Sequence, residues 1–176
     1  MAKGFLISSG QLCGQIIKAS AEGSLSLAIV GHKTLLEHSI NANYIFDHPN
    51  HCGDVAWVDR VCADMLARTS DLAAPKNRLN DVALKTRFVE IGRPDLYQKN
   101  YAGLCDYGHL VLRAPFLNDK TNFEKQTLSV ISQSLCALYG VVDSIEAFFN
   151  LGLDANVKDE VISYRDRVEP VEDGGS

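Results

Sequence analysis

The sequence contains little that would build a β-sheet or hold a fold together by covalent cross-links. Only five of its 176 residues are proline, and it has neither an Asn-Gly hairpin signal nor a pair of alternating strands. Its five cysteines are odd in number and scattered, without a Cys-x-x-Cys pair, which excludes a disulfide framework and a zinc ribbon. A chain of this length buries a core without such supports. We therefore expect one all-α domain in a reducing compartment.

Long apolar runs are also missing from the sequence. No segment approaches the ~20 consecutive apolar residues of a membrane-spanning helix. The apolar stretch at the N-terminus is interrupted by Gln11, Gln15 and Lys18, too early for an export signal. These absences predict a cytoplasmic protein with no membrane partner.

Basic residues exceed acidic ones only in the middle of the chain, although the net charge is −5. On a helix over 76–91, Lys76 and Arg87 fall on one side, whereas Arg78 and Lys85 fall on the opposite side. A nucleic-acid footprint requires one continuous basic stripe. This pattern instead predicts a solvated basic helix and disfavours a nucleic-acid partner.

Hydrophobic periodicity and helix-breaking residues predict an antiparallel bundle of six or seven helices. We expect residues 1–170 to form the domain and residues 171–176 to form a disordered tail. The expected helices cover residues 4–21, 24–48, 54–72, 75–92, a segment restarting after Pro94, 121–151 and about 154–168.

The segment 121–151 shows the most regular pattern. Thr121 followed by Glu124 is typical of a capping box. Such a regular apolar stripe requires helical partners. Short connections favour other helices of the same chain, and a homodimer through this helix is the alternative. The stripe consists of Leu128, Ile131, Leu135, Leu138, Val142, Ile145 and Phe149.

Polar residues interrupt the apolar face predicted for the helix over 24–48. His32 and Asn43 project within ~40° of Leu36 on this face, and buried polar groups need partners. They are candidate binding residues. Lys33 and Glu37 form an i, i+4 pair at the edge of the same face.

A second group of polar residues follows Pro94. Tyr97, Tyr101, Cys105 and His109 are each four residues apart, so they share one side of a continuous helix. Cys105 and His109 could form a thiolate–imidazole pair, but catalytic Cys and His usually come from separate elements. We expect a polar cluster in which Tyr101, Cys105 and His109 turn inward toward Glu37.

The stretch "YIFDHPNHCGD" raises the question of a metal site. It supplies His48, His51 and Cys52 from one loop, whereas zinc is usually held from two separated pieces of chain. A second set of ligands would have to come from Asp106 and His109, or from His38. The Pro, Asn and Gly residues of the loop favour a helix–helix turn. The sequence therefore predicts no metal and no cofactor.

The segments "KTLLEHSINANYIFDHP" and "LYQKNYAGLCDYGHL", followed by a long closing helix, resemble an uncharacterised family of bacterial helical proteins. Its members carry Arg-x-x-x-Glu on one helix and a Tyr-rich segment ending in Ser-x-x-x-His on another. The resemblance covers roughly residues 24–150. Lys33 stands at the Arg position, Glu37 and His109 match, and Cys105 replaces the Ser. The family implies a helical bundle with a polar cluster and no established activity.

These observations predict a non-enzymatic binding or regulatory module whose partner stays unknown. The alternative is a hydrolase acting on RNA or a nucleotide, as in toxin and defence systems. There Lys33 would supply the cation, His38 or His109 the acid–base group, and Glu37 would orient it. The cleavage motif of such ribonucleases uses Arg ahead of His, and only Lys33-x-x-x-x-His38 comes near it.

Overall fold

The structure is a computed structural model that describes residues 2–51, 82–109, 120–152, 159–160 and 163. Within these ranges every regular element is a helix and there is no strand. The predicted all-α class is therefore confirmed.

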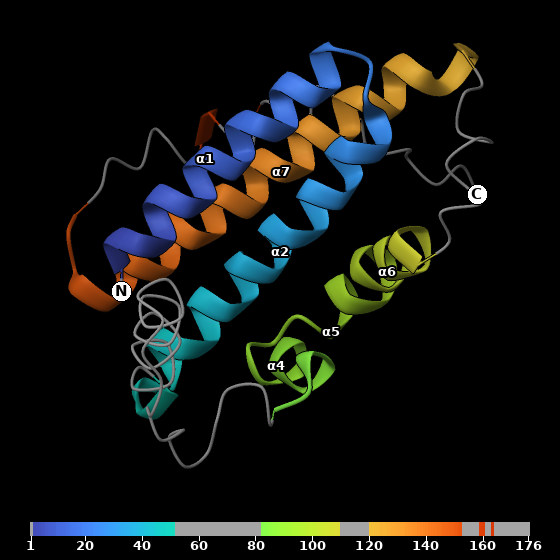
Figure 1. Cartoon of the computed structure of the whole chain (residues 1–176). Helices are drawn as coiled ribbons and strands as arrows, with labels where there is room; N and C mark the ends of the chain where they lie inside the picture. Colours follow the sequence, from blue (N-terminus) through green and yellow to red (C-terminus); the bar gives the residue numbers. More distant parts are fainter. Residues whose placement is uncertain (1, 52–81, 110–119, 153–158, 161–162, 164–176) are drawn as a thin grey trace, which may run out of the picture.

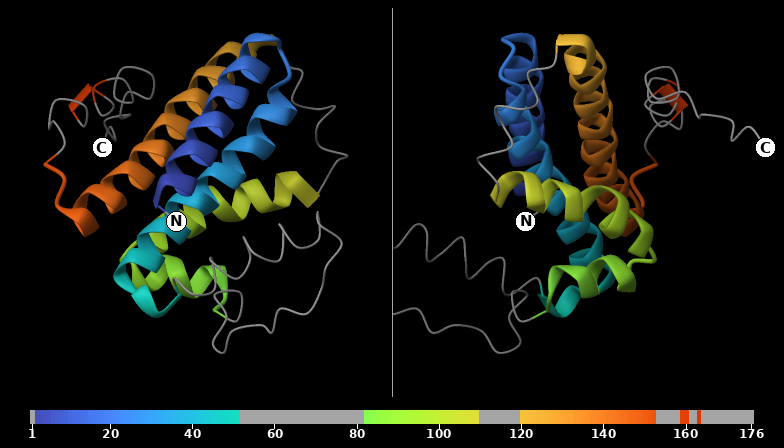
Figure 2. Two further views of the ribbon diagram at one scale, coloured as in Figure 1. Left: turned by 60° about the vertical axis from the view of Figure 1, so that its left-hand side comes forward. Right: turned by 90° about the vertical axis from the view of Figure 1, so that its right-hand side faces the viewer.

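Three long helices lie side by side and make up most of the described fold (Figure 1). They are α1 (Ala2–Ala21), α2 (Leu25–Asp47) and α7 (Lys120–Phe149). The turn between α1 and α2 contains Gly23 with a φ of 78°, a left-handed conformation that favours glycine. The first two helices match the predictions from periodicity, and Figure 2 shows the three helices adjacent from two other sides.

The directions of these helices differ in part from the predicted antiparallel arrangement. α1 runs antiparallel to α2, but α2 and α7 run in the same direction (Figure 1). His32 in the first half of α2 contacts Ser134 in the first half of α7, and Phe46 near the end of α2 packs on Phe148 near the end of α7. The chain between α2 and α7 is long enough to return to the end of the bundle at which α2 begins before α7 starts.

The shorter helices lie along one side of α2 (Figure 1). A one-turn helix η1 (Pro49–His51) follows α2, and α4 (Leu84–Glu90) packs against α2 from further along the chain. Beyond it, α5 (Pro94–Leu96), the π-helical turn η3 (Tyr97–Tyr101) and α6 (Ala102–His109) join into one helical segment. Proline at the start of this segment is expected, because its missing N–H has no partner in a first turn.

In the described part of the chain, five α-helices are longer than three residues, fewer than the six or seven predicted for the whole. α4 lies within the helix predicted over 75–92 but begins only at Leu84, since Val82 and Ala83 are not helical. Gly92 follows its end with a φ of 73°, as expected of a residue after a helix. The predicted helices at 54–72 and 154–168 lie wholly or almost wholly outside the described residues. The predicted tail, 171–176, also lies outside them.

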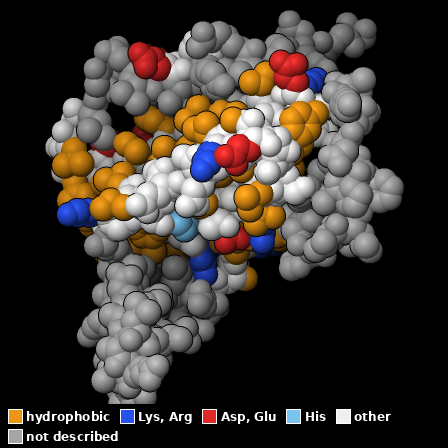
Figure 3. Space-filling model, turned by 45° about the horizontal axis from the view of Figure 1, so that its top comes forward, with side chains coloured by type: hydrophobic (Ala, Val, Ile, Leu, Met, Phe, Trp, Pro, Cys, Tyr) orange, Lys and Arg blue, Asp and Glu red, His pale blue; other side chains and the backbone are white. Residues whose placement is uncertain are grey.

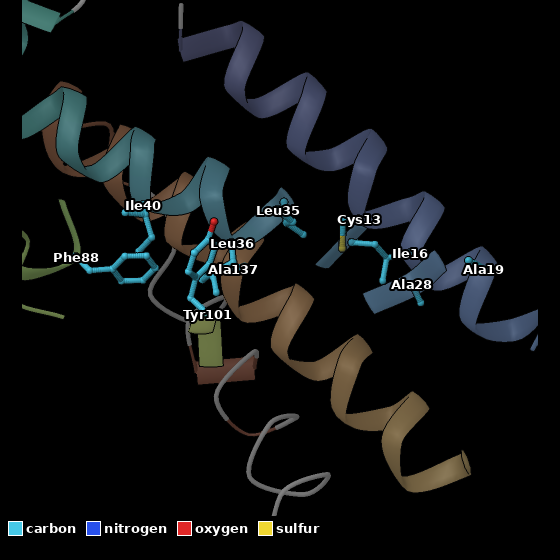
Figure 4. Close-up of a cluster of buried hydrophobic side chains, with 10 residues drawn as sticks. All are labelled: Cys13, Ile16, Ala19, Ala28, Leu35, Leu36, Ile40, Phe88, Tyr101 and Ala137. Atoms are coloured by element: carbon cyan, nitrogen blue, oxygen red, sulfur yellow. The ribbon is translucent and has the colours of Figure 1, made fainter. Parts of the chain in front are cut away.

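The main hydrophobic core forms where α1, α2, α4, η3 and α7 meet (Figure 4). The apolar spacing of α2 brings one of its faces to this point, as the periodicity predicted. Phe88 and Tyr101 carry the shorter helices into the same core. The buried members of the cluster are Cys13, Ile16, Ala19, Ala28, Leu35, Leu36, Ile40, Phe88, Tyr101 and Ala137.

The stripe predicted on α7 is not the side that packs most closely on α2. A Cβ at Gly140 would overlap Ser39 Oγ, so the two helices approach closely through small residues. Leu128 and Phe149, at the two ends of the predicted stripe, are exposed, and only Ile145 within it is buried. The buried side chains in the described part of α7 are Ser132, Ser134, Ala137, Val141, Ser144 and Ile145.

Among the described helices, one is long and apolar enough, by length and composition, to cross a membrane. It is the Phe123–Phe149 part of α7, whose most apolar window is 33% buried. No unbroken apolar run in the sequence predicts this helix, because α7 reaches its composition with interspersed Ser and Gly. The core helix of a soluble protein meets the same criterion.

Candidate functional site

The structure brings the side chains of Glu37 and Tyr101 into contact across 64 positions of the sequence. Tyr101 Oη donates a hydrogen bond of 2.5 Å to Glu37 Oε1. Glu37 comes from the middle of α2, and Tyr101 closes the π-helical turn η3. A hydrogen bond to a charged carboxylate is stronger than one between neutral groups. This pair therefore anchors the 94–109 helical segment to α2.

Lys33 completes the group from one turn earlier on α2. Its Nζ lies 3.6 Å from Glu37 Oε1 and 5.7 Å from the centroid of the Tyr101 ring. The Lys33 and Glu37 side chains keep 25% and 31% of their surface exposed. The cation thus balances the carboxylate and covers the face of the aromatic ring. The group is accessible from solvent on one side only, since Tyr101 is buried.

An aromatic cluster holds Tyr101 in place. The rings of Phe88 and Tyr97 lie 5.5 Å and 5.7 Å from its ring, and Tyr97 stacks on it at 29°. The wider π-helical turn brings Tyr97 and Tyr101 together, and π-turns are frequent at functional sites. The regular four-residue spacing assumed from the sequence therefore applies only to part of this segment.

Tyr101 acts as a hydrogen-bond donor over the whole physiological pH range. Burial raises the pKa of Tyr101 far above its ordinary value, and its hydrogen bonds to Glu37 and Cys105 raise it further. Its phenol stays protonated and cannot serve as a general base near neutral pH. The contribution of Cys105 to this shift places its side chain beside Tyr101. The side chain of His109 lies outside the described residues, so its place in the polar cluster stays a prediction.

His32 is buried and contacts α7. Its Nδ1 lies 3.0 Å from Ser134 Oγ, a polar pair between the two parallel helices. Asn43, the other polar residue predicted on this face, is half-buried near the end of α2. The need of His32 for a polar neighbour was predictable from burial, but its partner was not.

His38 points to α1 rather than to the polar cluster. Its Nδ1 lies 3.2 Å from Ser9 Oγ, and its ring meets Phe5 edge-on at 6.3 Å. Burial lowers the pKa of His38, and the negative charge of the neighbouring Glu37 opposes this only in part. The imidazole is therefore neutral near pH 7 and forms part of the α1–α2 contact.

We expect acid to destabilise the fold through His38. Its pKa in the folded protein lies below the ordinary 6.5 of the unfolded chain, so below pH 6.5 the unfolded chain binds a proton that the folded protein does not. The free energy of unfolding should then fall with decreasing pH, by at most about 1.4 kcal/mol per pH unit from this one group. Urea titrations of the wild type and His38→Gln between pH 7.5 and 5 measure it. Parallel pH dependences in the two proteins would contradict the assignment.

His48, the first residue after α2, contacts the C-terminal end of that helix. His48 Nδ1 lies 3.0 Å from the carbonyl oxygen of Tyr44, and the two rings stack at 4.2 Å. His48 Nε2 is 4.0 Å from Glu90 on α4. The side chains of His51 and Cys52 lie outside the described residues. Among the described residues no group of three or more His, Cys, Asp or Glu could hold a metal ion.

The prediction of a solvated basic helix is wrong for Arg87, which is only 6% exposed. Its Nε and Nη2 donate hydrogen bonds of 3.1 Å and 2.9 Å to the carbonyl oxygen of Val82, and its Nη1 donates one of 2.6 Å to Asn41 Oδ1 on α2. The guanidinium thus ties α4 to α2. The charge of Arg87 suggested exposure, and its partner on α2, Asn41, is 46 positions away in the sequence.

No family model, no curated protein and no solved structure matches the chain. The resemblance to a bacterial helical family therefore stays a prediction, carried by Lys33, Glu37, Cys105 and His109.

Proposed function

We propose that this chain is a non-enzymatic helical module that binds or regulates a partner in the cytoplasm. The observation that carries the proposal is the Glu37 carboxylate, which is engaged by Tyr101 from the facing segment and by Lys33 from its own helix. Held by these two contacts, the Glu37 carboxylate positions the 94–109 segment on α2, and its charge is balanced by that of Lys33. The exposed sides of Lys33 and Glu37 are where a partner would meet this group.

The positions of the candidate catalytic residues favour binding over catalysis. Lys33 and Glu37 face the 94–109 segment, whereas His38 faces α1 through Ser9. A cation and an acid–base group must reach the same substrate atom to cleave a phosphodiester. The residues that the hydrolase alternative needs from α2 are thus divided between two sides of that helix.

A hydrolase acting on RNA or a nucleotide is the second candidate. The partial exposure of the Lys33–Glu37 pair favours it, since a substrate phosphate could reach the cation. His109 would then have to supply the acid–base group. This candidate makes a different prediction from the binding module when single residues are replaced.

Two substitutions and an activity assay separate the two functions. We expect Glu37→Leu to lower the free energy of unfolding by about 1 to 3 kcal/mol, because the buried Tyr101 hydroxyl loses its acceptor. Tyr101→Phe should cost less, about 1 kcal/mol, and the double variant should cost less than the sum. Urea titrations provide these free energies.

The activity assay uses oligoribonucleotides and nucleotides with the wild type and His109→Ala. We expect no product above a protein-free blank from either protein. Product formed by the wild type and lost in His109→Ala at an unchanged melting temperature would overturn the binding module in favour of the hydrolase. Additive effects of Glu37→Leu and Tyr101→Phe would remove the observation on which the proposal rests.

The remaining features of the proposal concern the whole chain. We propose that the full chain completes a bundle of six or seven helices, with helices at 54–72 and 154–168. Cys13 and Cys105 are thiols, in keeping with a reducing compartment. Neither a nucleic acid nor a membrane is proposed as partner. A homodimer through residues 121–151 would have to use the side of α7 that carries Leu128, which is exposed.

A further inference from the structure

The outer side of α1 carries an apolar strip that the rest of the described chain does not cover. Leu6, Ile7 and Ile17 are 38%, 49% and 40% exposed. At 100° per residue they fall within one sector of the helix together with the exposed Gly10 and Gly14. Seen from the upper side of Figure 1, the surface shows several hydrophobic patches with few charged side chains among them (Figure 3).

The glycines of this strip differ from those that the fold itself requires. A Cβ at Gly31 would lie 2.8 Å from Ile16 Cγ1, and one at Gly140 would overlap Ser39, so both allow close helix contacts within the chain. A Cβ at Gly10 or Gly14 would meet no described atom within 4 Å. Each glycine inside a helix costs about 1 kcal/mol relative to alanine. Nothing in the described fold offsets this cost at these two positions.

We propose that this strip, formed by Leu6, Ile7, Gly10, Gly14 and Ile17, is the contact surface for a second copy of this chain. Two α1 helices that cross antiparallel about a two-fold axis at the level of residue 12 place Gly10 against Gly14 of the second copy. The same operation places Ile7 against Ile17. The strip is thus complementary to itself, as the surface of a two-fold dimer must be. Small residues between larger apolar ones allow two helices to approach closely.

The charges at the ends of α1 select a second copy in this orientation. Antiparallel pairing brings Lys3 next to Glu22 of the second copy, whereas parallel pairing would bring Lys3 against Lys3. Glu22 keeps a long ion pair of 3.9 Å with Lys18, and both side chains are largely exposed, so it remains accessible to a second cation. Antiparallel helices also pair opposite ends of their dipoles.

The contact is limited in size, which sets the expected affinity. A helix of 20 residues is about 30 Å long, so two crossing helices bury less than the ~1,200 Å² of a standard stable interface. We expect a dimer that dissociates on dilution. It uses a different surface from the polar cluster, so it stands or falls independently of the proposed function.

Sedimentation velocity of the full chain over a concentration series tests the dimer. We expect the wild type to shift from one to two copies per particle as its concentration rises. The double variant Gly10→Leu/Gly14→Leu should raise the dissociation constant at least about tenfold, which is 1.4 kcal/mol. Its fold should persist, because both positions have open space and leucine favours helix. Gly103→Leu, at an exposed glycine of α6 with open space, is the matched control and should dimerise like the wild type.

A charge exchange provides a second readout. Lys3→Glu should weaken the dimer, and Lys3→Glu/Glu22→Lys should restore it. If Lys3 served only the fold of its own chain, the second substitution would not restore the dimer. A wild type that stays monomeric at every concentration would overturn the proposal, and so would a double glycine variant that dimerises normally. Binding of the monomeric chain to phospholipid vesicles, with no dimer in their absence, would assign the strip to a lipid surface and also overturn it.

Discussion

Replacing Phe88 with alanine is expected to lower the free energy of unfolding by about 3 to 5 kcal/mol. Phe88 is fully buried, and its ring packs 5.5 Å from the rings of Tyr97 and Tyr101. Removing it leaves a cavity where α4 and the 94–109 segment meet α2, lined also by Ile40. Urea unfolding followed by circular dichroism measures the loss.

The neighbouring Val89 provides the control for this substitution. It lies on the same helix but is 53% exposed, so Val89→Ala should change the free energy of unfolding by no more than about 0.5 kcal/mol. Equal, small effects at positions 88 and 89 would show that α4 does not dock through Phe88. The placement of Tyr101 beside Glu37 would then lose its support, because the aromatic cluster holds that ring.

Replacing Gly140 with leucine is expected to cost about 3 kcal/mol, since it drives α2 and α7 apart. A Cβ at this position already overlaps Ser39 Oγ, and Ser39 is buried in the contact. Adding four carbon atoms to a packed helix interface forces backbone shifts. The same separation would stretch the contact between His32 and Ser134 one to two turns away. Thermal and urea unfolding report the change.

Two further variants show whether the overlap is the cause. Gly140→Ala should be destabilising in the wild type but nearly neutral or stabilising when Ser39 is alanine, because the overlapping atom is the Ser39 hydroxyl. Gly103→Leu, where no described atom is near, should leave stability unchanged or slightly raised. If Gly140→Leu were as harmless as Gly103→Leu, the close approach of α2 and α7 through small residues would be wrong.

Part of the candidate site followed from the sequence, because it depends on spacing within single helices. Lys33 and Glu37 are one turn apart, so their contact is local. Tyr101 turns inward to Glu37, in agreement with the expected polar cluster, whereas the buried His32 has its partner on α7 and not on the Tyr-rich segment. Arg87 was misassigned, because its burial depends on Asn41 and on the carbonyl oxygen of Val82, which no pattern around position 87 reveals.

The side of α7 used for packing shows the same division. Periodicity of large apolar residues selected the stripe from Leu128 to Phe149. The structure buries Ser134, Ala137 and Val141 beside it. Small residues allow a shorter distance between the axes of two helices. The side of a helix that is buried most deeply therefore need not be its most hydrophobic side. A score of hydrophobicity along the sequence contains no information about this distance.

The sequence by itself determined that the described chain is helical and where α1, α2 and the turn at Gly92 begin or end, because these features depend on interactions within a few residues. Only the tertiary structure decided that α2 and α7 run parallel, that α7 packs through its small residues, and that Arg87 is buried. Each of these depends on which surfaces fit together over long distances in the chain. Fit between surfaces is a property of pairs of helices, and no single segment contains it.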